Sequence, residues 1–592
     1  MVMMIKNRTN TCGELTDDSI DQKVILNGWV SKVRDLGSVV FVDLRDRYGK
    51  TQLVFNADIH LDSFNAAKKL SLEDVVGIEG KVVLRPNEAQ NKESLTGMID
   101  VEVISLNIYN KSLTPPFDIN DRNSAMEDHR LKYRYLELRT KELQTNLIMR
   151  HNVSILTRNF LSDKNFIEVE TPILMKSTPE GARDFLVPSR LHKGKFYALP
   201  QSPQTYKQLL MVSGFDKYFQ IVKCFRDEDF RADRQPEFTQ IDIEMSFINQ
   251  DDIIELGTKL IKYLWDSVLN VKFEKEFPVL TYEQAMQNYG SDKPDIRFEM
   301  KLQDFNTYIK KSTFNTFKST VESGGLVKGI VCPNAEGYSR KVIDELTEYM
   351  KNYYGTKGLA WFKVNNNIFE GGIGKFFDSN LQGEIINDLS ILENSIVFLV
   401  GDIKKTTLQA MGALRLKIAE REGLINDGDW APLWVVDFPL FEKDQKQNRF
   451  ISLHHPFTSP NPEDLELLNK YPEKVRSLGY DIVMNGYELG GGSIRIHDSQ
   501  MQRNIFDILG ISEKEANEKF GFLMNAFKYG APPHGGMAFG LDRIVMLLVG
   551  SNQIRDVIAF PKTTSATSLM DNSPSPVDEI QLDELGLKIK SN

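Results

Sequence analysis

The chain has 592 residues, of which 41% are hydrophobic and 26% are charged, as is typical of a globular protein with about three or four domains. Its net charge of −10 argues against general affinity for nucleic acid, although a local basic face is not excluded. Cys12, Cys224 and Cys332 lie far apart, which excludes a paired-cysteine metal site and a disulfide framework and predicts a reducing, cytoplasmic location. No segment has the apolar core of a signal peptide or a membrane span.

Residues 1–112 are predicted to form a small β-domain. Runs rich in β-branched and aromatic residues, separated by turn residues, predict strands at 24–34, 38–45, 51–55, 76–84 and 99–106. Short strands at this density favour a closed barrel of the OB type. A three-layer β-domain is the alternative that spacing alone leaves open.

The remaining chain mixes helical and strand patterns. Residues 113–140 contain a proline pair and predict a hinge. A domain with alternating elements is expected in two parts, 141–288 and 426–560, separated by an inserted α+β domain at 289–425 that is rich in Lys, Asn and Gly, and residues 561–592 form a C-terminal extension. Helices are predicted at 141–164, 203–212, 251–269 and 541–549, with Pro203 in a first helical turn, and strands at 218–225, 238–247, 434–441 and 486–497.

A charged run between two predicted strands is the first candidate site. Residues 225–237 hold eight charged side chains, which on a surface would ordinarily be a solvated face. The following strand alternates, however, so that Ile241 and Ile243 share an apolar face while Gln240, Asp242 and Glu244 share the opposite one. A strand with a core on one side and polar groups on the other favours a ligand-facing hairpin.

Two motifs carry a resemblance to a known family. The spacing of Arg226-Asp227-Glu228, Arg234, Phe238 and Asp242 resembles the second signature motif of class II aminoacyl-tRNA synthetases, and residues 535–543, GGMAFGLDR, are similar to the third. The helix and Pro172 strand upstream resemble the first, dimer-forming motif, although a plain edge strand is nearly as compatible. The resemblance implies an α+β multidomain protein with an N-terminal five-stranded OB barrel, an antiparallel-sheet catalytic domain and an inserted α+β domain, acting as a homodimer.

The chemistry of amino-acid activation accounts for the arginines. A substrate carboxylate attacks the α-phosphate of ATP, so the enzyme needs no nucleophile and must instead hold two anions together, for which arginine is well suited. The resemblance assigns catalysis to Arg226 and Arg543. It assigns ATP binding to Arg226, Asp227, Glu228, Gln235, Phe238, Glu488, Gly540, Leu541, Asp542 and Arg543, with Glu488 as a single carboxylate ligand for Mg²⁺.

The amino acid is expected to be L-aspartate. A buried carboxylate must be paired, and Lys207 and Arg495 supply two cations, whereas a lysyl enzyme would need an acid. The resemblance is to bacterial aspartyl-tRNA synthetases, includes residues 411–417 of the insertion, and leaves asparaginyl enzymes as the nearest alternative. It implies an aspartate site made of Glu180, Ser202, Gln204, Lys207, Arg226, Asp242, His454 and Arg495.

The N-terminal barrel is expected to bind the anticodon of tRNA(Asp). OB folds stack bases on aromatic side chains, and the resemblance assigns stacking to Phe41 and base contacts to Arg34, Gln52 and Asp100, the last standing where the family often has Glu. Strand alternation alone also allows Phe41 in the barrel core. The resemblance also implies that tRNA(Asn) is rejected, because Leu36 stands where family members that charge both tRNAs often carry His; a relaxed enzyme is the alternative. A non-catalytic tRNA-binding paralogue and an amidating ligase are the rivals from other classes.

Overall fold

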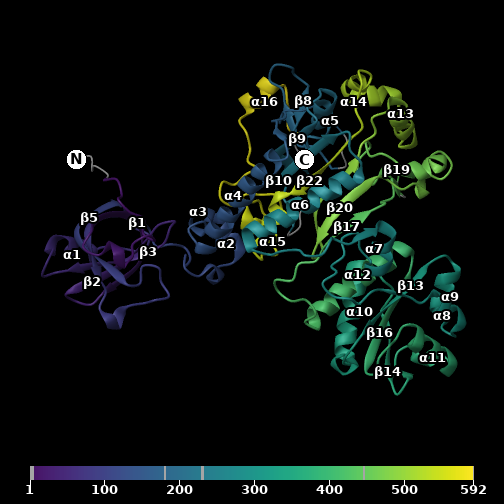
Figure 1. Cartoon of the computed structure of the whole chain (residues 1–592), viewed down its shortest axis with the longest axis horizontal. Coiled ribbons are helices and arrows are strands. Elements are labelled where there is room, and N and C mark those ends of the chain that lie inside the picture. Colours follow the sequence, from purple (N-terminus) through teal and green to yellow (C-terminus); the bar gives the residue numbers. More distant parts are fainter. Residues whose placement is uncertain (1–5, 179–181, 229–232, 445–446, 591–592) are drawn as a thin grey trace. The chain divides into compact units, whose positions relative to one another are not determined.

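The computed structural model describes residues 6–178, 182–228, 233–444 and 447–590 (Figure 1). The chain divides into two compact units. The first unit comprises Met1–Met149 and Arg555–Pro576, and the second comprises Arg150–Ile554 and Val577–Asn592. Within the described residues, no helix combines the length and the apolar character needed to cross a membrane.

The first unit contains a closed five-stranded barrel, which confirms the predicted OB fold. Its strands follow the order β1-β2-β3-β5-β4, with β1 (Lys23–Asp35), β2 (Val39–Arg45), β3 (Lys50–Asn56), β4 (Val75–Leu84) and β5 (Ile99–Asn110). Alternate side chains of β2, namely Val40, Val42 and Leu44, are buried in the barrel core. Phe41 therefore points to the outer face, where it is half-buried, so the alternative that placed it in the core was wrong.

Helices complete the first unit. They are α1 (Leu61–Ala67), α2 (Glu127–Lys132), α3 (Arg134–Glu137) and the beginning of α4 (Lys141–Ser162). The buried guanidinium of Arg134 donates hydrogen bonds to the carbonyls of Arg555, Ile558 and Ala559. These bonds fasten the returning chain to the helices of the hinge segment.

The second unit is built on an eight-stranded sheet. Its order is β11-β17-β20-β21-β22-β10-β9-β6, and neighbouring strands are antiparallel except for the two pairs at the ends, β11–β17 and β6–β9. The strands are β6 (Ile167–Glu168), β9 (Lys217–Phe225), β10 (Glu237–Ser246), β11 (Val279–Thr281), β17 (Pro432–Val436), β20 (Gly479–Met484), β21 (Tyr487–Ile494) and β22 (His534–Gly540).

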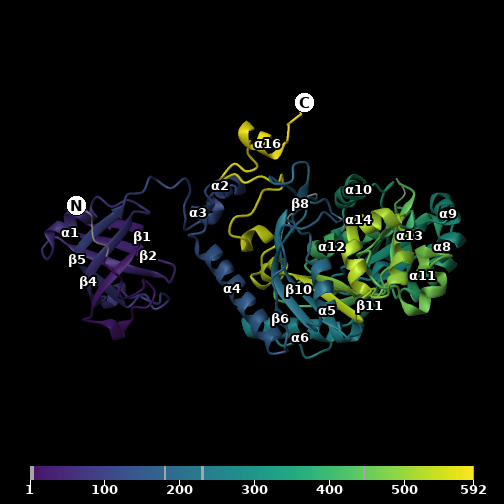
Figure 2. The same ribbon diagram turned by 90° about the horizontal axis from the view of Figure 1, so that it is seen from above.

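Helices α6 (Gln250–Leu269) and α15 (Leu541–Leu548) pack on this sheet (Figures 1 and 2). Gly257 of α6 lies against the ring of Trp434, and the indole nitrogen of Trp434 donates to Thr258 Oγ1 at 2.9 Å. The face of β10 that carries Ile241 and Ile243 is buried. The opposite face is left for the polar side chains.

Around the sheet lie β7 (Leu186–Pro188), β8 (Phe196–Ala198), β18 (Phe441–Asp444), β19 (Arg449–Ser452), α5 (Gln204–Val212), α13 (Ser499–Ile508), α14 (Glu513–Phe527) and α16 (Glu579–Leu585). Two sequence expectations need correction. Pro203 precedes the first turn of α5 as its N-cap. The strand predicted at 434–441 is broken, because Asp437 has φ +56°, which ends β17 before β18 begins.

The inserted segment forms a separate five-stranded sheet in the order β12-β13-β16-β14-β15. Its elements are α7 (Tyr282–Tyr289), β12 (Gln303–Asp304), α8 (Asn306–Lys311), α9 (Asn315–Glu322), β13 (Leu326–Cys332), α10 (Arg340–Tyr354), β14 (Ala360–Asn365), β15 (Ile368–Glu370), α11 (Ser379–Asp388), β16 (Ser395–Asp402) and α12 (Lys404–Arg421). Successive side chains of β16 point to opposite faces of this sheet. Phe398 packs in one hydrophobic cluster with α10 and α12, and Leu399 packs in another with α8, α9 and α11 (Figure 1). The predicted α+β insertion is thereby confirmed.

Candidate active site

Two adjoining cavities lie over the polar face of β10, with volumes of about 280 Å³ and 410 Å³. We call them the first cavity and the second cavity. Four residues line both: Arg226, Gln240, Glu488 and Ala538. The two cavities therefore meet at residues contributed by three neighbouring strands and by the loop that follows β9.

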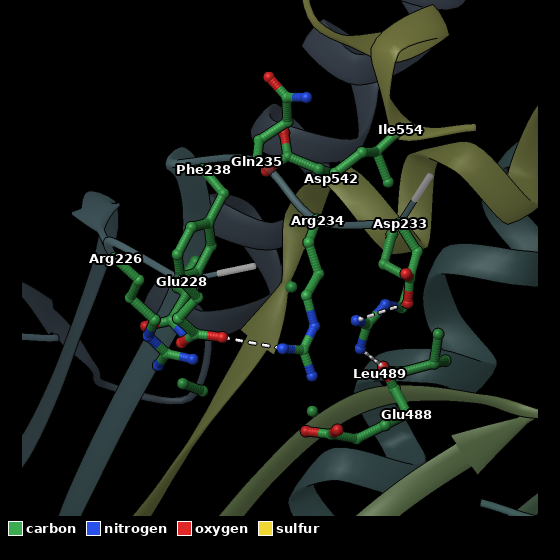
Figure 3. A pocket seen from close by; sticks show the side chains of 15 residues that line it. Arg226, Glu228, Asp233, Arg234, Gln235, Phe238, Glu488, Leu489, Asp542 and Ile554 are labelled. Carbon is green, nitrogen blue, oxygen red and sulfur yellow. Dashed lines mark hydrogen bonds and ion pairs between the residues drawn. The ribbon is translucent and has the colours of Figure 1, made fainter. Parts of the chain in front are cut away.

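The first cavity is lined by arginines and carboxylates (Figure 3). The Arg226 guanidinium carbon lies 5.1 Å from the centre of the Phe238 ring, and Arg234 Nη1 lies 2.8 Å from Glu228 Oε2. Arg543, in the first turn of α15, donates to the Glu488 carbonyl. The cavity thus offers an aromatic face, flanking guanidinium groups and carboxylate oxygens, a combination suited to a base and its phosphates.

Most residues assigned to ATP binding come together here. The first cavity is lined by Arg226, Glu228, Gln235, Phe238, Glu488, Gly540, Asp542 and Arg543. Asp227 and Leu541 do not line it: the Asp227 amide donates to the Arg183 carbonyl at 3.1 Å, and Leu541 is buried in the core. The Asp542 carboxylate accepts from the Thr239 amide at 2.7 Å and pairs with Arg150, so it also fastens α15 to β10 and α4.

The second cavity contains a buried network of two cations and two anions. Lys207 Nζ lies 2.7 Å from Asp242 Oδ1 and 3.2 Å from Glu244 Oε2. Arg495 binds both oxygens of Glu244, with Nε–Oε1 at 3.0 Å and Nη2–Oε2 at 3.2 Å. Lys207 is only 1% exposed and Arg495 only 4%. Charges this deeply buried are held in place by one another.

The two carboxylates of this network differ in acidity. Burial raises the pKa of Asp242 to about 6, although Lys207 lies beside it. Burial also disfavours the charged form of Glu244, but Arg495 and Lys207 outweigh this and lower its pKa to about 2. Asp242 Oδ2 has no hydrogen-bond partner among the described residues.

Histidines and further carboxylates complete the second cavity, which is also lined by Ser202, Gln204, Asp292, His454 and Asp481. His454 Nε2 lies 3.4 Å from Asp481 Oδ1, and although burial opposes protonation, this carboxylate raises the pKa of His454 above its usual value. Burial, together with Arg495 and Lys207, lowers the pKa of the adjacent His455 to about 3. Glu180, also predicted for this site, lies outside the described residues.

Several residues of the site were not among the predicted ones. Gln240, which lines both cavities, and Glu244, which pairs with Arg495, share the polar face of β10 with Asp242, so the same alternation could have found them. Asp292 follows α7 in an irregular segment and gave no sequence signal. Within the described part of the chain, no three His, Cys, Asp or Glu side chains are grouped to hold a metal by themselves.

The predicted anticodon residues form one cluster on the outside of the barrel. Arg34 Nη2 donates to Gln52 Oε1 at 2.6 Å, and Gln52 Nε2 donates to Asp100 Oδ1 at 3.0 Å. The Arg34 guanidinium carbon lies 5.8 Å from the centre of the Phe41 ring. Arg85, which the sequence analysis did not select, donates to Asp100 Oδ1 at 2.9 Å. Burial raises the pKa of Asp100.

Comparison with known proteins decides the family. The model of the tRNA synthetases class II (D, K and N) matches residues 126–564. The chain belongs to this family. A model of the OB-fold nucleic acid binding domain matches residues 24–113 of the same class II synthetase chain.

Relatives of this class II synthetase match along almost its whole length. The aspartate–tRNA ligase of Staphylococcus carnosus (strain TM300) is 52% identical over 589 residues, covering 99% of this chain and 100% of the relative. That of Staphylococcus aureus (strain NCTC 8325 / PS 47) is 50% identical over 588 residues, with the same coverage. A solved putative aspartyl-tRNA synthetase from Leishmania major Friedlin is similar in fold, with a TM-score of 0.60, 19% identity and 96% of each chain covered.

Proposed function

We propose that the chain is an aspartate–tRNA ligase. It activates L-aspartate with ATP to aspartyl-adenylate and pyrophosphate, and then transfers the aspartyl group to the 3′ end of tRNA(Asp). The observation that carries this proposal is the pair of buried cations, Lys207 and Arg495, in a cavity that adjoins a phosphate-suited one. The names of the 50–52% identical relatives support the same function.

In the first step, an α-carboxylate oxygen of aspartate attacks the α-phosphorus of ATP. An oxygen–phosphorus bond forms, the bond from the α-phosphorus to the bridging oxygen of pyrophosphate breaks, and pyrophosphate leaves. The reacting atoms belong at the junction of the cavities, where Arg226 can contact both the carboxylate and the α-phosphate. Phe238 stacks on the adenine, Glu228 accepts from its amino group, and Arg543 binds the γ-phosphate.

Aspartate is recognised by charge. Its side-chain carboxylate binds Lys207 and Arg495, and the bidentate contact with Glu244 fixes the plane of the Arg495 guanidinium. The unpartnered Asp242 Oδ2 accepts from the α-ammonium, assisted by Ser202, Gln204 and Glu180. A neutral asparagine side chain would leave the two buried cations without an incoming anion, which disfavours it.

The first cavity also suits Mg²⁺ bound to ATP. Mg²⁺ keeps several waters and takes phosphate oxygens, so one carboxylate is sufficient protein ligation, and Glu488 lines both cavities. The ion would neutralise phosphate charge as pyrophosphate leaves. The proposed nucleotide site is completed by Asp227, Gln235, Gly540, Leu541 and Asp542. Of these, Leu541 contributes by packing in the core, and Asp542 by holding α15 against β10.

The tRNA is bound through the barrel, with Phe41 stacking on an anticodon base and Arg34, Gln52 and Asp100 contacting base edges.

A homodimer is proposed because β6 is an edge strand and the nearby chain exposes apolar side chains: Ile155, Ile167, Ile173 and Leu174. A cytoplasmic location is also proposed, because the three cysteines are free and tRNA charging serves protein synthesis.

The decisive experiment is pyrophosphate exchange with purified, active-site-titrated protein. Exchange should depend on aspartate and be much weaker with asparagine or lysine. Charging of tRNA(Asp) and tRNA(Asn) should then be compared, and charging of tRNA(Asp) alone is expected. Absence of aspartate-dependent exchange, or equal exchange with asparagine, would reject the proposal.

A further inference from the structure

The inserted domain contains the loop that brings Asp292 into the second cavity. This loop, residues 290–300, begins at the end of α7 and leads into the inserted sheet. Asp292 lines the second cavity together with Tyr282 and Asp481.

The start of the loop rests directly on helix α12 of the insertion. A Cβ on Gly412 would lie 2.7 Å from the Gly290 carbonyl oxygen, and a Cβ on Gly290 would lie 2.2 Å from the Leu408 carbonyl oxygen. Gly290 also has φ +68°. Only glycine allows the two backbones to approach this closely in this conformation.

The rest of the loop is held by one side chain of α12, Arg415. Its Nε donates to the Met300 carbonyl at 2.9 Å and its Nη1 to the Asp295 carbonyl at 2.8 Å. Its Nη2 donates to the carbonyls of Phe298 and Glu299, at 2.6 Å and 2.9 Å. The guanidinium carbon also lies 3.8 Å from the centre of the Phe298 ring. One residue therefore fixes four carbonyls of the loop.

Burying the charged side chain of Arg415 costs free energy, and the packing of α12 alone does not require a charged residue at this position. The side chain is 1% exposed, and burial lowers its pKa to about 10. Replacing a buried charged group by a well-packed apolar residue of similar volume often leaves the stability of a fold unchanged or raises it. The arginine instead defines the conformation of the loop backbone, because its rigid fork matches four carbonyl positions.

The other side of the loop reaches residues of the second cavity. The Asp295 Cβ lies 3.5 Å from the Cβ position of Gly486, in the turn that precedes Glu488. The negative charge of Asp292 contributes to the raised pKa of Asp481, as does that of Glu488. Asp292 thus belongs to a group of carboxylates in the same cavity as the Lys207–Arg495 pair.

We infer that the inserted domain takes part in amino-acid binding, with Arg415 of α12 as a positioning residue that holds Asp292 in the wall of the aspartate site. Asp292 supplies negative potential for the α-ammonium of the zwitterionic substrate, while Lys207 and Arg495 receive its side-chain carboxylate. This inference rests on the proposed aspartate activation. It gives the insertion a role in the first reaction step.

Kinetic variants test it in aspartate-dependent pyrophosphate exchange. Asp292→Asn and Arg415→Met should each raise the KM for aspartate about tenfold and leave the KM for ATP within about twofold, because one charge acts on one substrate. The double variant should raise the KM for aspartate no more than the more severe of the two single variants does, since both changes remove the same interaction. Arg415→Lys, which cannot form the fork, should lie between wild type and Arg415→Met.

Arg421→Met is the matched control. Arg421 is also on α12 and donates to a backbone carbonyl, that of Gly337, at 3.0 Å, but this carbonyl lies outside the loop of residues 290–300. Its variant should leave the KM for aspartate within about twofold of wild type, because it does not touch the loop. If Arg421→Met and Arg415→Met raise this KM equally, or if the effects of Asp292→Asn and Arg415→Met multiply, the inference is overturned.

Amide hydrogen exchange tests whether Arg415 holds the loop of residues 290–300, without relying on the reaction. Residues 291–300 should exchange faster in Arg415→Met than in wild type and be unchanged in Arg421→Met. Unchanged exchange in Arg415→Met would overturn the inference even if aspartate is the substrate. A different result separates this inference from the proposed function. If the wild-type protein shows no aspartate-dependent pyrophosphate exchange, the proposed function and the substrate role of Asp292 are refuted. Faster amide exchange of the loop in Arg415→Met would still support the role of Arg415 in holding the loop.

Discussion

Replacement of Lys207 by methionine tests the charge network of the second cavity most directly. The ammonium lies 2.7 Å from Asp242 and 3.2 Å from Glu244, and all three groups are buried. Removing one partner of a buried ion pair costs about 3–5 kcal/mol of stability. The loss should be towards the lower end, because Glu244 keeps Arg495 and Asp242, with its pKa already near 6, can take up a proton.

The same change should weaken aspartate binding selectively. A hydrogen bond to a charged group contributes about 1.5–3 kcal/mol, so the KM for aspartate in pyrophosphate exchange should rise roughly 10- to 150-fold. The KM for ATP should stay within about twofold, because Lys207 lines only the second cavity.

Lys405→Met is a suitable control for this measurement. Lys405 pairs with Glu442 at the same distance, 2.7 Å, but its side chain is 65% exposed. An exposed pair contributes about 1 kcal/mol or less, and no kinetic change is expected. The reasoning would be refuted if Lys207→Met kept the KM for aspartate within about twofold of wild type, or if it raised the KM for ATP by the same factor.

Three further results are expected. Arg226→Ala should lower the exchange rate by at least about 100-fold, because it removes charge stabilisation at the reacting phosphate, and a near wild-type rate would contradict its catalytic role. Phe41→Ala should lower the kcat/KM of tRNA(Asp) charging about 5- to 150-fold and spare exchange, since base stacking contributes about 1–3 kcal/mol; equal loss in both assays would show that Phe41 is structural. The kcat/KM for aspartate should fall as the pH drops through about 6, because Asp242 is then protonated and can no longer pair with the α-ammonium; a profile flat from pH 5 to 7 would contradict this assignment.

Alternation along the strands made much of this molecule predictable. The barrel strands, the hairpin of β9 and β10 and the polar face that carries Asp242 all follow from side-chain periodicity, which is a local property of the sequence. The outward orientation of Phe41 depended on the exact register, which alternation left open. The break at Asp437 depended on a backbone angle that its neighbours do not encode.

Long-range partners were not predictable in the same way. Arg495 was expected to meet the substrate, but its bidentate partner Glu244 lies 251 residues away in the chain. Their contact depends on β21, β22 and β10 being neighbours in the sheet. Asp292 entered the site only through the packing of its loop on α12. Such contacts arise from tertiary structure, so no local pattern marks them.

Strand β10 fixes the distance between the two proposed substrate sites. Phe238 and Glu244 are six positions apart on one face, and at about 3.3 Å per residue they are separated by roughly 20 Å. That length is set by covalent geometry, and β10 lies between β9 and β22, so its register cannot slip without breaking both ladders. The distance between Phe238, which is proposed to stack on the base, and the end beneath Arg495 is therefore constant. Under the proposed function, substitutions at the Glu244 end would change which amino acid fits while the proposed nucleotide end keeps its geometry.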